Sequence, residues 1–204
     1  MLNIYLLRHG ETQYNADGNR YCGRTDIELT RAGIKQAQSV HHQLKNIQID
    51  AVYSSPLMRA STTAEIVIGN TVVNTDPRLI EVDFGSWEGK TKEEFIAEDA
   101  SLWEAWARDP ENIRAGCTGE TGREVIERVD SFYNEMLLKH ENQTILVVGH
   151  NGINRLYMAF KLGMPLKNYS RIVQENSAIT FFQLDALGEF ILKKLNSSKL
   201  VNSL

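Results

Sequence analysis

Five side chains of this 204-residue chain have types that could carry out chemistry together: Arg8, His9, Arg59, Glu81 and His150. The planar guanidinium group of arginine matches the oxygens of a phosphate group. A neutral imidazole can attack phosphorus and form a covalent intermediate, while a second imidazole stabilises charge on the transferring group. A carboxyl group can protonate the leaving oxygen and later accept a proton from water. The set is complete for phosphoryl transfer that needs neither a metal nor another cofactor.

A metal site is the alternative use of two histidines. Two arginines beside them would repel a cation, and the histidines show no HxxxH or HxD spacing. The two cysteines, Cys22 and Cys117, also lack a metal-type spacing. We therefore expect no metal site in this chain.

Both histidines follow an apolar run that is typical of a buried strand. The runs are LNIYLL at 2–7 and TILVVG at 144–149. Further strands are predicted at 51–55, 71–75, 178–185 and 189–195, and helices at 30–44, 57–68, 122–137 and 151–163. This alternation predicts an α/β fold, a three-layer α/β/α sandwich with a mainly parallel central sheet. Because ligands bind outside the carboxyl ends of such strands, we expect His9 and His150 to meet there.

Two of the predicted helices show a clear start and an apolar face. Thr30 can cap the first of them, which carries a stripe at helical spacing made of Ile34, Ala37, His41 and Leu44. The helix from Gly122 has a longer stripe, made of Val125, Ile126, Val129, Phe132, Tyr133, Met136 and Leu137. Both helices are expected to pack on the sheet. We place the remaining histidines, His41, His42 and His140, on helix surfaces or edges.

Two segments lack a regular pattern: residues 8–26 are expected to be a long loop, and residues 83–120 to be irregular with two short helical stretches. Residues 8–26 follow the first strand, and residues 83–120 contain all three tryptophans. Long loops within compact domains are often functional, so 83–120 is predicted to form a lid or substrate pocket. Trp103 and Trp106 would either pack this lid on the core or line the pocket for the leaving group. Arg108 and Arg114 are expected to be solvated, with contact to a charged substrate as the alternative.

Composition indicates one soluble α/β domain spanning residues 1–204. With 42% hydrophobic residues the chain can bury a substantial core, and its net charge of -4 does not suit a nucleic-acid binder. No signal peptide or membrane span is apparent, because Arg8 interrupts the first apolar run. Two cysteines without a disulfide framework favour a cytoplasmic protein. The edge of the predicted sheet is a candidate contact for a homodimer.

The motifs around these residues resemble those of the histidine phosphatase superfamily, also called phosphoglycerate mutase-like. They are RHGET at 8–12 with Asn15 behind it, SSPLMRASTTAE at 54–65, LIEVDFGSWEGKT at 79–91 and VVGHNGINR at 147–155. The four motifs occur in the family's order and span most of the chain. The resemblance implies the phosphoglycerate mutase-like fold and a small phosphomonoester as substrate.

The resemblance also implies a role for each matching residue. His9 would be the nucleophile that becomes phosphorylated, and Glu81 would be the general acid and then the base for water. The phosphate would be held by the side chains of Arg8, Asn15, Arg59 and His150 and by the backbone N–H of Asn151, which opens a helix. Asp83 and Glu88 compete with Glu81 for the acid role, but the family places the acid ahead of the DFGSWEG stretch.

Within the family, this sequence resembles the phosphatases more than the mutases. The residues after RHG are Glu11, Thr12, Gln13, Tyr14 and Asn15, whereas the mutases carry Ser and Trp at two of these positions. The expected activity is metal-independent hydrolysis of a phosphomonoester, as in broad-specificity phosphatases and α-ribazole phosphatase. A cofactor-dependent phosphoglycerate mutase is the alternative, followed by a non-catalytic module that binds phospho-ligands. The physiological ester stays open among sugar phosphates, phosphoglycerate, α-ribazole phosphate and phosphoserine.

Overall fold

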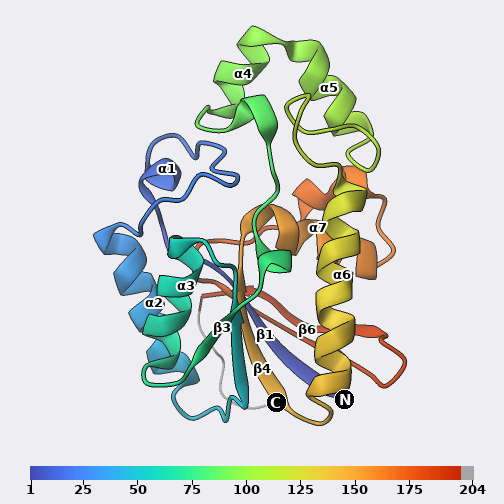
Figure 1. Ribbon diagram of the computed structural model, residues 1–204. Helices are drawn as coiled ribbons and strands as arrows, with labels where there is room; N and C mark the ends of the chain where they lie inside the picture. The colour runs from blue at the N-terminus through green and yellow to red at the C-terminus, as the bar shows by residue number, and fades with distance from the viewer. Residues whose placement is uncertain (199–204) are drawn as a thin grey trace.

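In the computed structural model, which describes residues 1–198, six strands form one mixed sheet with helices on both faces (Figure 1). The strand order is β3-β2-β4-β1-β5-β6. The bounds are Leu2–Arg8 for β1, Ala51–Ser54 for β2, Val73–Thr75 for β3, Thr144–Gly149 for β4, Ile179–Leu184 for β5 and Phe190–Ser197 for β6. The first four strands in this order are parallel, and β5 and β6 are antiparallel additions at one edge. The predicted α/β sandwich is confirmed, with this antiparallel edge as the added detail.

Two pairs of helices cover the two faces of the sheet. Helices α2 (Arg31–Leu44) and α3 (Met58–Ile68) lie on one face, and α6 (Gly122–Lys139) and α7 (Asn151–Lys161) lie on the other (Figure 1). Successive side chains of a strand point to opposite faces. Leu6 therefore packs toward α6 and α7, while its neighbour Leu7 packs toward α2 and α3. Both faces of the central strands are thus buried, which explains their unbroken apolar sequence.

The buried face of α2 differs from the apolar stripe that was predicted for this helix. Its buried residues are Gly33, Ala37, Val40 and Leu44, whereas Ile34 is 38% exposed and His41 is exposed. A Cβ atom on Gly33 would lie 2.2 Å from the carbonyl oxygen of Glu11. The close approach of this helix to residues 10–11 therefore sets which of its faces points inward. The predicted cap is confirmed, because the Thr30 side chain accepts a hydrogen bond from the N–H of Gly33.

The segment 8–26 contains a short helix, α1 (Gln13–Ala16), where only a loop was predicted. Its start is a capping box. The side chain of Thr12 accepts from the N–H of Asn15, and the side chain of Asn15 accepts from the N–H of Thr12. A capping box usually carries Glu or Gln at the third position, so Asn15 is an uncommon partner. This small helix holds Asn15 in place beside the first histidine motif.

Beyond the carboxyl ends of the parallel strands stand α4 (Lys92–Glu98) and α5 (Ala100–Arg108), away from the sheet (Figure 1). They are preceded by the 3₁₀ turns η1 (Pro77–Leu79) and η2 (Gly85–Trp87), and a third turn, η3 (Leu166–Arg171), follows α7. Aromatic rings join this part to the rest of the chain: Trp87 stacks on Phe95 at 4.8 Å and meets Trp106 at 6.0 Å. Tyr21 from the first loop contacts Phe95 at 5.0 Å.

Within residues 1–198, no helix is long and apolar enough to cross a membrane. The two edge strands of the sheet are β3 and β6.

Candidate active site

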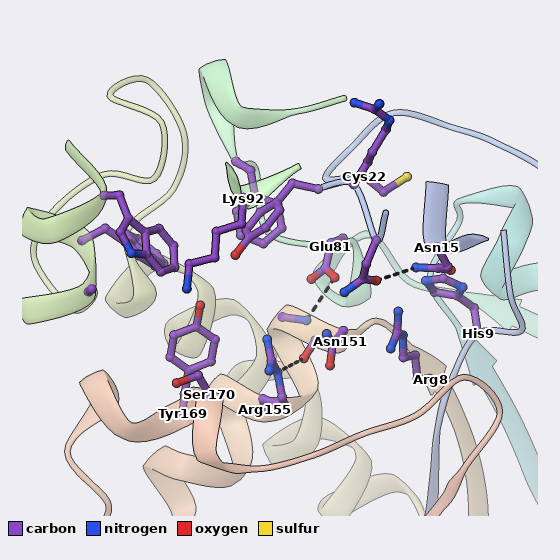
Figure 2. Close-up of a pocket in the computed structure, with 18 of the residues that line it drawn as sticks. Arg8, His9, Asn15, Cys22, Glu81, Lys92, Asn151, Arg155, Tyr169 and Ser170 are labelled. Carbon is purple, nitrogen blue, oxygen red and sulfur yellow. Dashed lines mark hydrogen bonds between the residues drawn. The ribbon is translucent and has the colours of Figure 1, made fainter. Parts of the chain in front are cut away.

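The five chemistry-bearing residues converge at the carboxyl ends of the parallel strands. Strands β1 and β4 are neighbours, and Arg8 lies opposite Gly149 in their register, so His9 and His150 emerge side by side. Their ring centroids are 5.2 Å apart. Arg59 comes from the second residue of α3 and Glu81 from the segment after η1. Arg8, His9, Arg59 and Glu81 line one cavity of about 270 Å³, shown in Figure 2.

His9 has one ring nitrogen occupied and one free. Its Nδ1 lies 2.7 Å from the carbonyl oxygen of Gly10. A carbonyl can only accept, so Nδ1 carries the proton and the lone pair of the neutral ring is on Nε2. Burial, and after it the charges of Arg59 and Arg8, lower the pKa of His9 well below its ordinary value of 6.5. The ring is therefore neutral near pH 7, with Nε2 available as a nucleophile.

The two arginines are buried and keep their positive charges facing the cavity. Arg59 is fully buried, and its terminal nitrogens donate to the carbonyl oxygens of Thr25 and Gly23 at 2.8 and 2.7 Å. Arg8 donates to the carbonyl oxygen of Gln174 at 3.0 Å. Burial lowers the pKa of Arg8 to about 10, against the attraction of Glu81. Each guanidinium retains a buried Nε–H without a partner in the described chain, as a phosphate-binding fork would.

Asn15 also lines the cavity. Its side-chain oxygen accepts from the N–H of Thr12 at 3.0 Å and from the side chain of Asn176 at 3.2 Å. The NH₂ group donates one N–H to the side-chain oxygen of Asn19 at 3.4 Å, so its other N–H is the part of Asn15 left for an anion. The same Asn176 amide donates to the carbonyl oxygen of His9 at 3.0 Å, so it connects Asn15 to His9.

Glu81 sits against the start of helix α7. Its carboxylate accepts from the backbone N–H groups of Gly152 at 3.0 Å, Ile153 at 3.1 Å and Val82 at 2.9 Å. The first N–H groups of a helix have no partner within the helix, so a carboxylate there satisfies them. Glu81 is 6% exposed, and its side chain faces the cavity (Figure 2). The competing acids lie outside the cavity wall, since Glu88 holds the backbone of Arg24 and Thr25.

His150 is the N-cap of α7 and is fully buried. Neither of its ring nitrogens has a hydrogen-bond partner within residues 1–198. Burial, followed by the charges of Arg59 and other neighbours, lowers the pKa of His150 well below 6.5, so the ring is neutral. A buried imidazole without a partner costs free energy, which a bound anion that accepts its N–H would recover. The backbone N–H of the next residue, Asn151, lies at the open end of the same helix.

The cavity also contains residues that the sequence analysis did not single out. Its outer part is lined by Arg20, Lys92, Arg155, Lys167, Tyr169 and Ser170. Trp103 and Trp106 both line the cavity and pack in the aromatic cluster, so their two alternative roles hold together. Arg114 pairs with Glu124 at 2.6 Å and does not line it. Arg108 is exposed and lies outside the lining as well.

One prediction about the remaining histidines is wrong. His140 is only 8% exposed, and its ring lies between the hydroxyl of Tyr53 at 2.8 Å and the side-chain oxygen of Gln143 at 2.6 Å. It therefore belongs to the core at the opposite end of the sheet. In the described part of the chain, no three His, Cys, Asp or Glu side chains are grouped so that they could hold a metal ion.

Comparison with known proteins agrees with this geometry. The model of the histidine phosphatase superfamily (branch 1) matches residues 4–198, which is nearly the whole chain. The chain belongs to this superfamily. The resemblance seen in the four motifs is thereby confirmed, and the protein is a histidine phosphatase by its family and its curated relatives.

Two curated relatives of this histidine phosphatase are phosphatases of different esters. An adenosylcobalamin/alpha-ribazole phosphatase from Escherichia coli is 37% identical over 166 residues, which cover 80% of this chain and 81% of that protein. Phosphoserine phosphatase 1 from Hydrogenobacter thermophilus is 32% identical over 195 residues, covering 95% and 92%. A crystal structure of a phosphoserine phosphatase mutant from Entamoeba histolytica with phosphoserine matches with a TM-score of 0.88, 31% identity and coverage of 97% and 98%.

Proposed function

We propose that this histidine phosphatase hydrolyses a small phosphomonoester through a phosphohistidine on His9, without a metal. The observation that carries the proposal is the state of His9. Its Nδ1–H is held by the Gly10 carbonyl, its ring is neutral, and it lines one cavity with two arginines and Glu81. A nucleophile, a phosphate-binding fork and an acid facing one another are the parts that phosphoryl transfer requires.

In the first half-reaction, the phosphoryl group binds between Arg8, Arg59 and His150, with the Asn15 amide and the Asn151 N–H as further donors. The Nε2 lone pair of His9 attacks phosphorus, and the P–O bond to the leaving group breaks. Glu81 must carry a proton at this stage and transfers it to the leaving oxygen. The alcohol departs, the phosphoryl group stays on Nε2, and Glu81 is left as a carboxylate.

In the second half-reaction, water takes the place of the alcohol. The Glu81 carboxylate accepts a proton from this water as its oxygen attacks phosphorus, and the P–N bond to His9 breaks. Inorganic phosphate leaves, His9 regains its neutral ring, and Glu81 is again protonated for the next cycle. The backbone N–H groups of Gly152 and Ile153 hold the carboxylate in one orientation through both steps.

The test is hydrolysis of a panel of phosphomonoesters in EDTA by the wild type, by His9→Ala and by His42→Ala, an exposed-histidine control on α2. The panel includes α-ribazole phosphate and phosphoserine, because relatives of this chain are named for them. It also includes 3-phosphoglycerate with 2,3-bisphosphoglycerate, which detects mutase turnover. We expect phosphate release that survives EDTA, persists in His42→Ala and is lost in His9→Ala. Isomerisation of 3-phosphoglycerate with little release would instead establish a mutase.

The cytoplasmic location and the homodimer expected from the sequence stay predictions.

A further inference from the structure

The acid of the proposed mechanism comes from a stretch without regular structure. The other four residues of the site end a strand, follow one or belong to a helix, whereas Glu81 lies in residues 80–84, between η1 and η2. Buried backbone groups outside helices and strands still need hydrogen-bond partners, which other parts of the chain must supply. The residues that supply these partners therefore set the position of Glu81.

Three of these hydrogen bonds come from Arg128 of α6, the helix that packs against η1 (Figure 1). Its Nη1 donates to the carbonyl oxygens of Arg78 and Ile80, both at 2.7 Å, and its Nη2 donates to that of Glu81 at 3.3 Å. The Nε and the second N–H of Nη2 donate to the two carboxylate oxygens of Glu120 at 2.9 and 3.0 Å. All five N–H groups of the guanidinium are thus used, three of them on the main chain beside the acid.

Glu120 binds the same stretch on the other side of the acid. The N–H of Asp83 donates to the Glu120 carboxylate at 3.0 Å, and the N–H of Glu120 donates to the carbonyl oxygen of Asp83 at 2.9 Å. Glu120 directly precedes Thr121, the N-cap of α6, so the start of this helix carries both members of the pair. The main chain is thereby held before Glu81 by Arg128 and after it by Glu120.

This ion pair differs from one on the surface of the same helix. The side chains of Arg128 and Glu120 are only 17% and 13% exposed. Arg123 pairs with Glu111 at 2.9 Å, but these side chains are 58% and 45% exposed, and Arg123 also binds the side chain of Asn112. An exposed ion pair contributes little to stability. A rigid guanidinium fork that binds three main-chain carbonyls instead fixes the geometry of the segment that it contacts.

The carboxylate of Glu81 has separate support from the first N–H groups of α7. Gly152 and Ile153 donate to it at 3.0 and 3.1 Å. Hydrogen bonds of this length allow little displacement, so they form only where the main chain brings the side chain to the start of α7. Because α6 holds the main chain and α7 holds the carboxylate, a shift of the main chain weakens the bonds that orient the acid.

We propose that Arg128 and Glu120 are a positioning pair, which sets where the Glu81 carboxyl group meets the leaving oxygen and the attacking water. This inference rests on the proposed function and adds two residues on which its acid depends. Within the described chain, neither of the two lines the cavity, so their effect on the reaction passes through Glu81.

The test compares two esters that differ in their need for an acid. Arg128→Met removes all five donors, so kcat/KM for an alkyl phosphate should fall about 10–100-fold, as for a small displacement of a reacting group. A nitrophenyl phosphate needs no acid for its departure, so its kcat/KM should fall much less. Arg123→Met is the matched control, because it removes an arginine of the same helix from an ion pair with a glutamate. The control should leave both values unchanged.

A double variant distinguishes positioning from a general effect on the fold. Glu81→Gln leaves no acid to be positioned, so the addition of Arg128→Met should lower kcat/KM for the alkyl phosphate by less than about threefold further. Independent effects would multiply instead, and the double variant would then show the full loss of both single variants.

Two milder variants keep the test decisive if Arg128→Met does not fold. Arg128→Lys keeps the charge without the fork, and Glu120→Gln replaces one accepting oxygen by an NH₂ group. Both should show the same selective loss for the alkyl phosphate, by about tenfold, as for one hydrogen bond to a charged group. Thermal unfolding identifies the variants that are folded at the assay temperature, and only these are compared.

Unchanged kinetics in the folded variants, an equal loss for both esters, or a fully multiplicative loss in the double variant would overturn the inference and leave the phosphatase assignment intact. A wild-type enzyme without ester hydrolysis, or a Glu81→Gln variant that loses both esters equally, would instead contradict the proposed function itself.

Discussion

At the scale of single residues, one hydrogen bond decides how His9 can act. The Gly10 carbonyl fixes the proton on Nδ1, and burial beside Arg8 and Arg59 keeps the ring neutral. Arginine would thus have two effects in the proposed mechanism, because the same charges that are proposed to bind phosphate also disfavour protonation of His9. Burial, followed by the charges of Arg59 and other neighbours, likewise lowers the pKa of His150 and keeps its ring neutral.

The role of Glu81 predicts a dependence on the leaving group. Glu81→Gln cannot donate a proton, so kcat/KM for an alkyl phosphate should fall about 10²–10⁴-fold. A nitrophenyl phosphate needs no acid for its departure, so its kcat/KM should fall much less. Hydrolysis of the phosphoenzyme needs Glu81 as the base for either ester, so kcat should fall for both. Because the first step is slowed much less for the nitrophenyl ester, its nitrophenol should be released in a burst. Stopped-flow absorbance measures both quantities, and equal losses in kcat/KM for the two esters would remove Glu81 from the acid role.

At the scale of elements, helix α7 has the task of orienting that carboxylate. Its first N–H groups point at Glu81 because β4 ends directly before the helix and His150 is its N-cap. Gly152 allows this close contact, since a Cβ atom there would lie 2.7 Å from the Glu81 Oε1 and 2.9 Å from a methyl group of Val82.

Gly152→Ala should therefore act on catalysis through Glu81. Displacement of the carboxylate from its backbone donors should lower kcat/KM for an alkyl phosphate about 10–100-fold, as expected for a lost hydrogen bond to a charged group. The loss for a nitrophenyl phosphate should be smaller. Alanine is the better helix former by about 1 kcal/mol, so α7 itself should persist, as circular dichroism would show. An unchanged preference between the two esters would mean that the helix start does not position the acid.

Element prediction from sequence succeeded where apolar periodicity was strong. The strands 2–7 and 144–149 and the long helix from Gly122 were found because each buries a continuous apolar face. Helix α1 was missed because its capping box uses Asn15, and the inward face of α2 was misplaced because contact between Gly33 and Glu11 decides it. Such contacts join different segments of the chain, and the apolar periodicity within one segment does not show which other segment packs against it.

At the scale of the whole molecule, the two neutral histidines make stability depend on pH. The pKa values of His9 and His150 are lowered in the folded state, whereas both residues bind a proton near pH 6.5 when unfolded. Below pH 6.5 the unfolded state therefore holds more protons, and the free energy of unfolding decreases as the pH falls. Each histidine contributes a slope of up to about 1.4 kcal/mol per pH unit.

Urea unfolding between pH 6 and 5 measures this slope. Substitution of one histidine, as in His9→Gln or His150→Gln, should reduce it by about 1.4 kcal/mol per pH unit relative to the wild type. Carboxylates titrate in all of these proteins, so their contribution to the slope cancels when the wild type and a variant are compared. An identical slope in the wild type and both variants would show that the two histidines are not held neutral.

The arrangement of the whole molecule also explains which parts of the site could be predicted from the sequence. Arg8 and His9 lie at the end of β1, His150 follows β4 and Arg59 lies early in α3, so topology alone brings these four together. Glu81 lies in the irregular segment after η1 and was predicted only through the motif that surrounds it. Arg155 had a detectable signal, because it follows Asn151 by one helical turn and shares its side of the helix. Lys92 and Lys167 had none, since α4 reaches the cavity through the packing of Phe95 on Trp87, and η3 reaches it through its contacts with α7.

Capture of the phosphoryl group on His9 is the most direct measurement of the proposed mechanism. Glu81→Gln is mixed with nitrophenyl phosphate that carries a radiolabelled phosphoryl group, and the reaction is quenched in alkali, in which a phosphohistidine survives. Treatment with acid then distinguishes a phosphohistidine, which is hydrolysed, from a phosphoserine-type ester, which is stable. Peptide mapping should then find the label on His9, stable to alkali and lost in acid, and none should form when His9→Ala is combined with Glu81→Gln. Label on another residue, or turnover of the same protein with no labelled intermediate in the burst phase, would contradict the account.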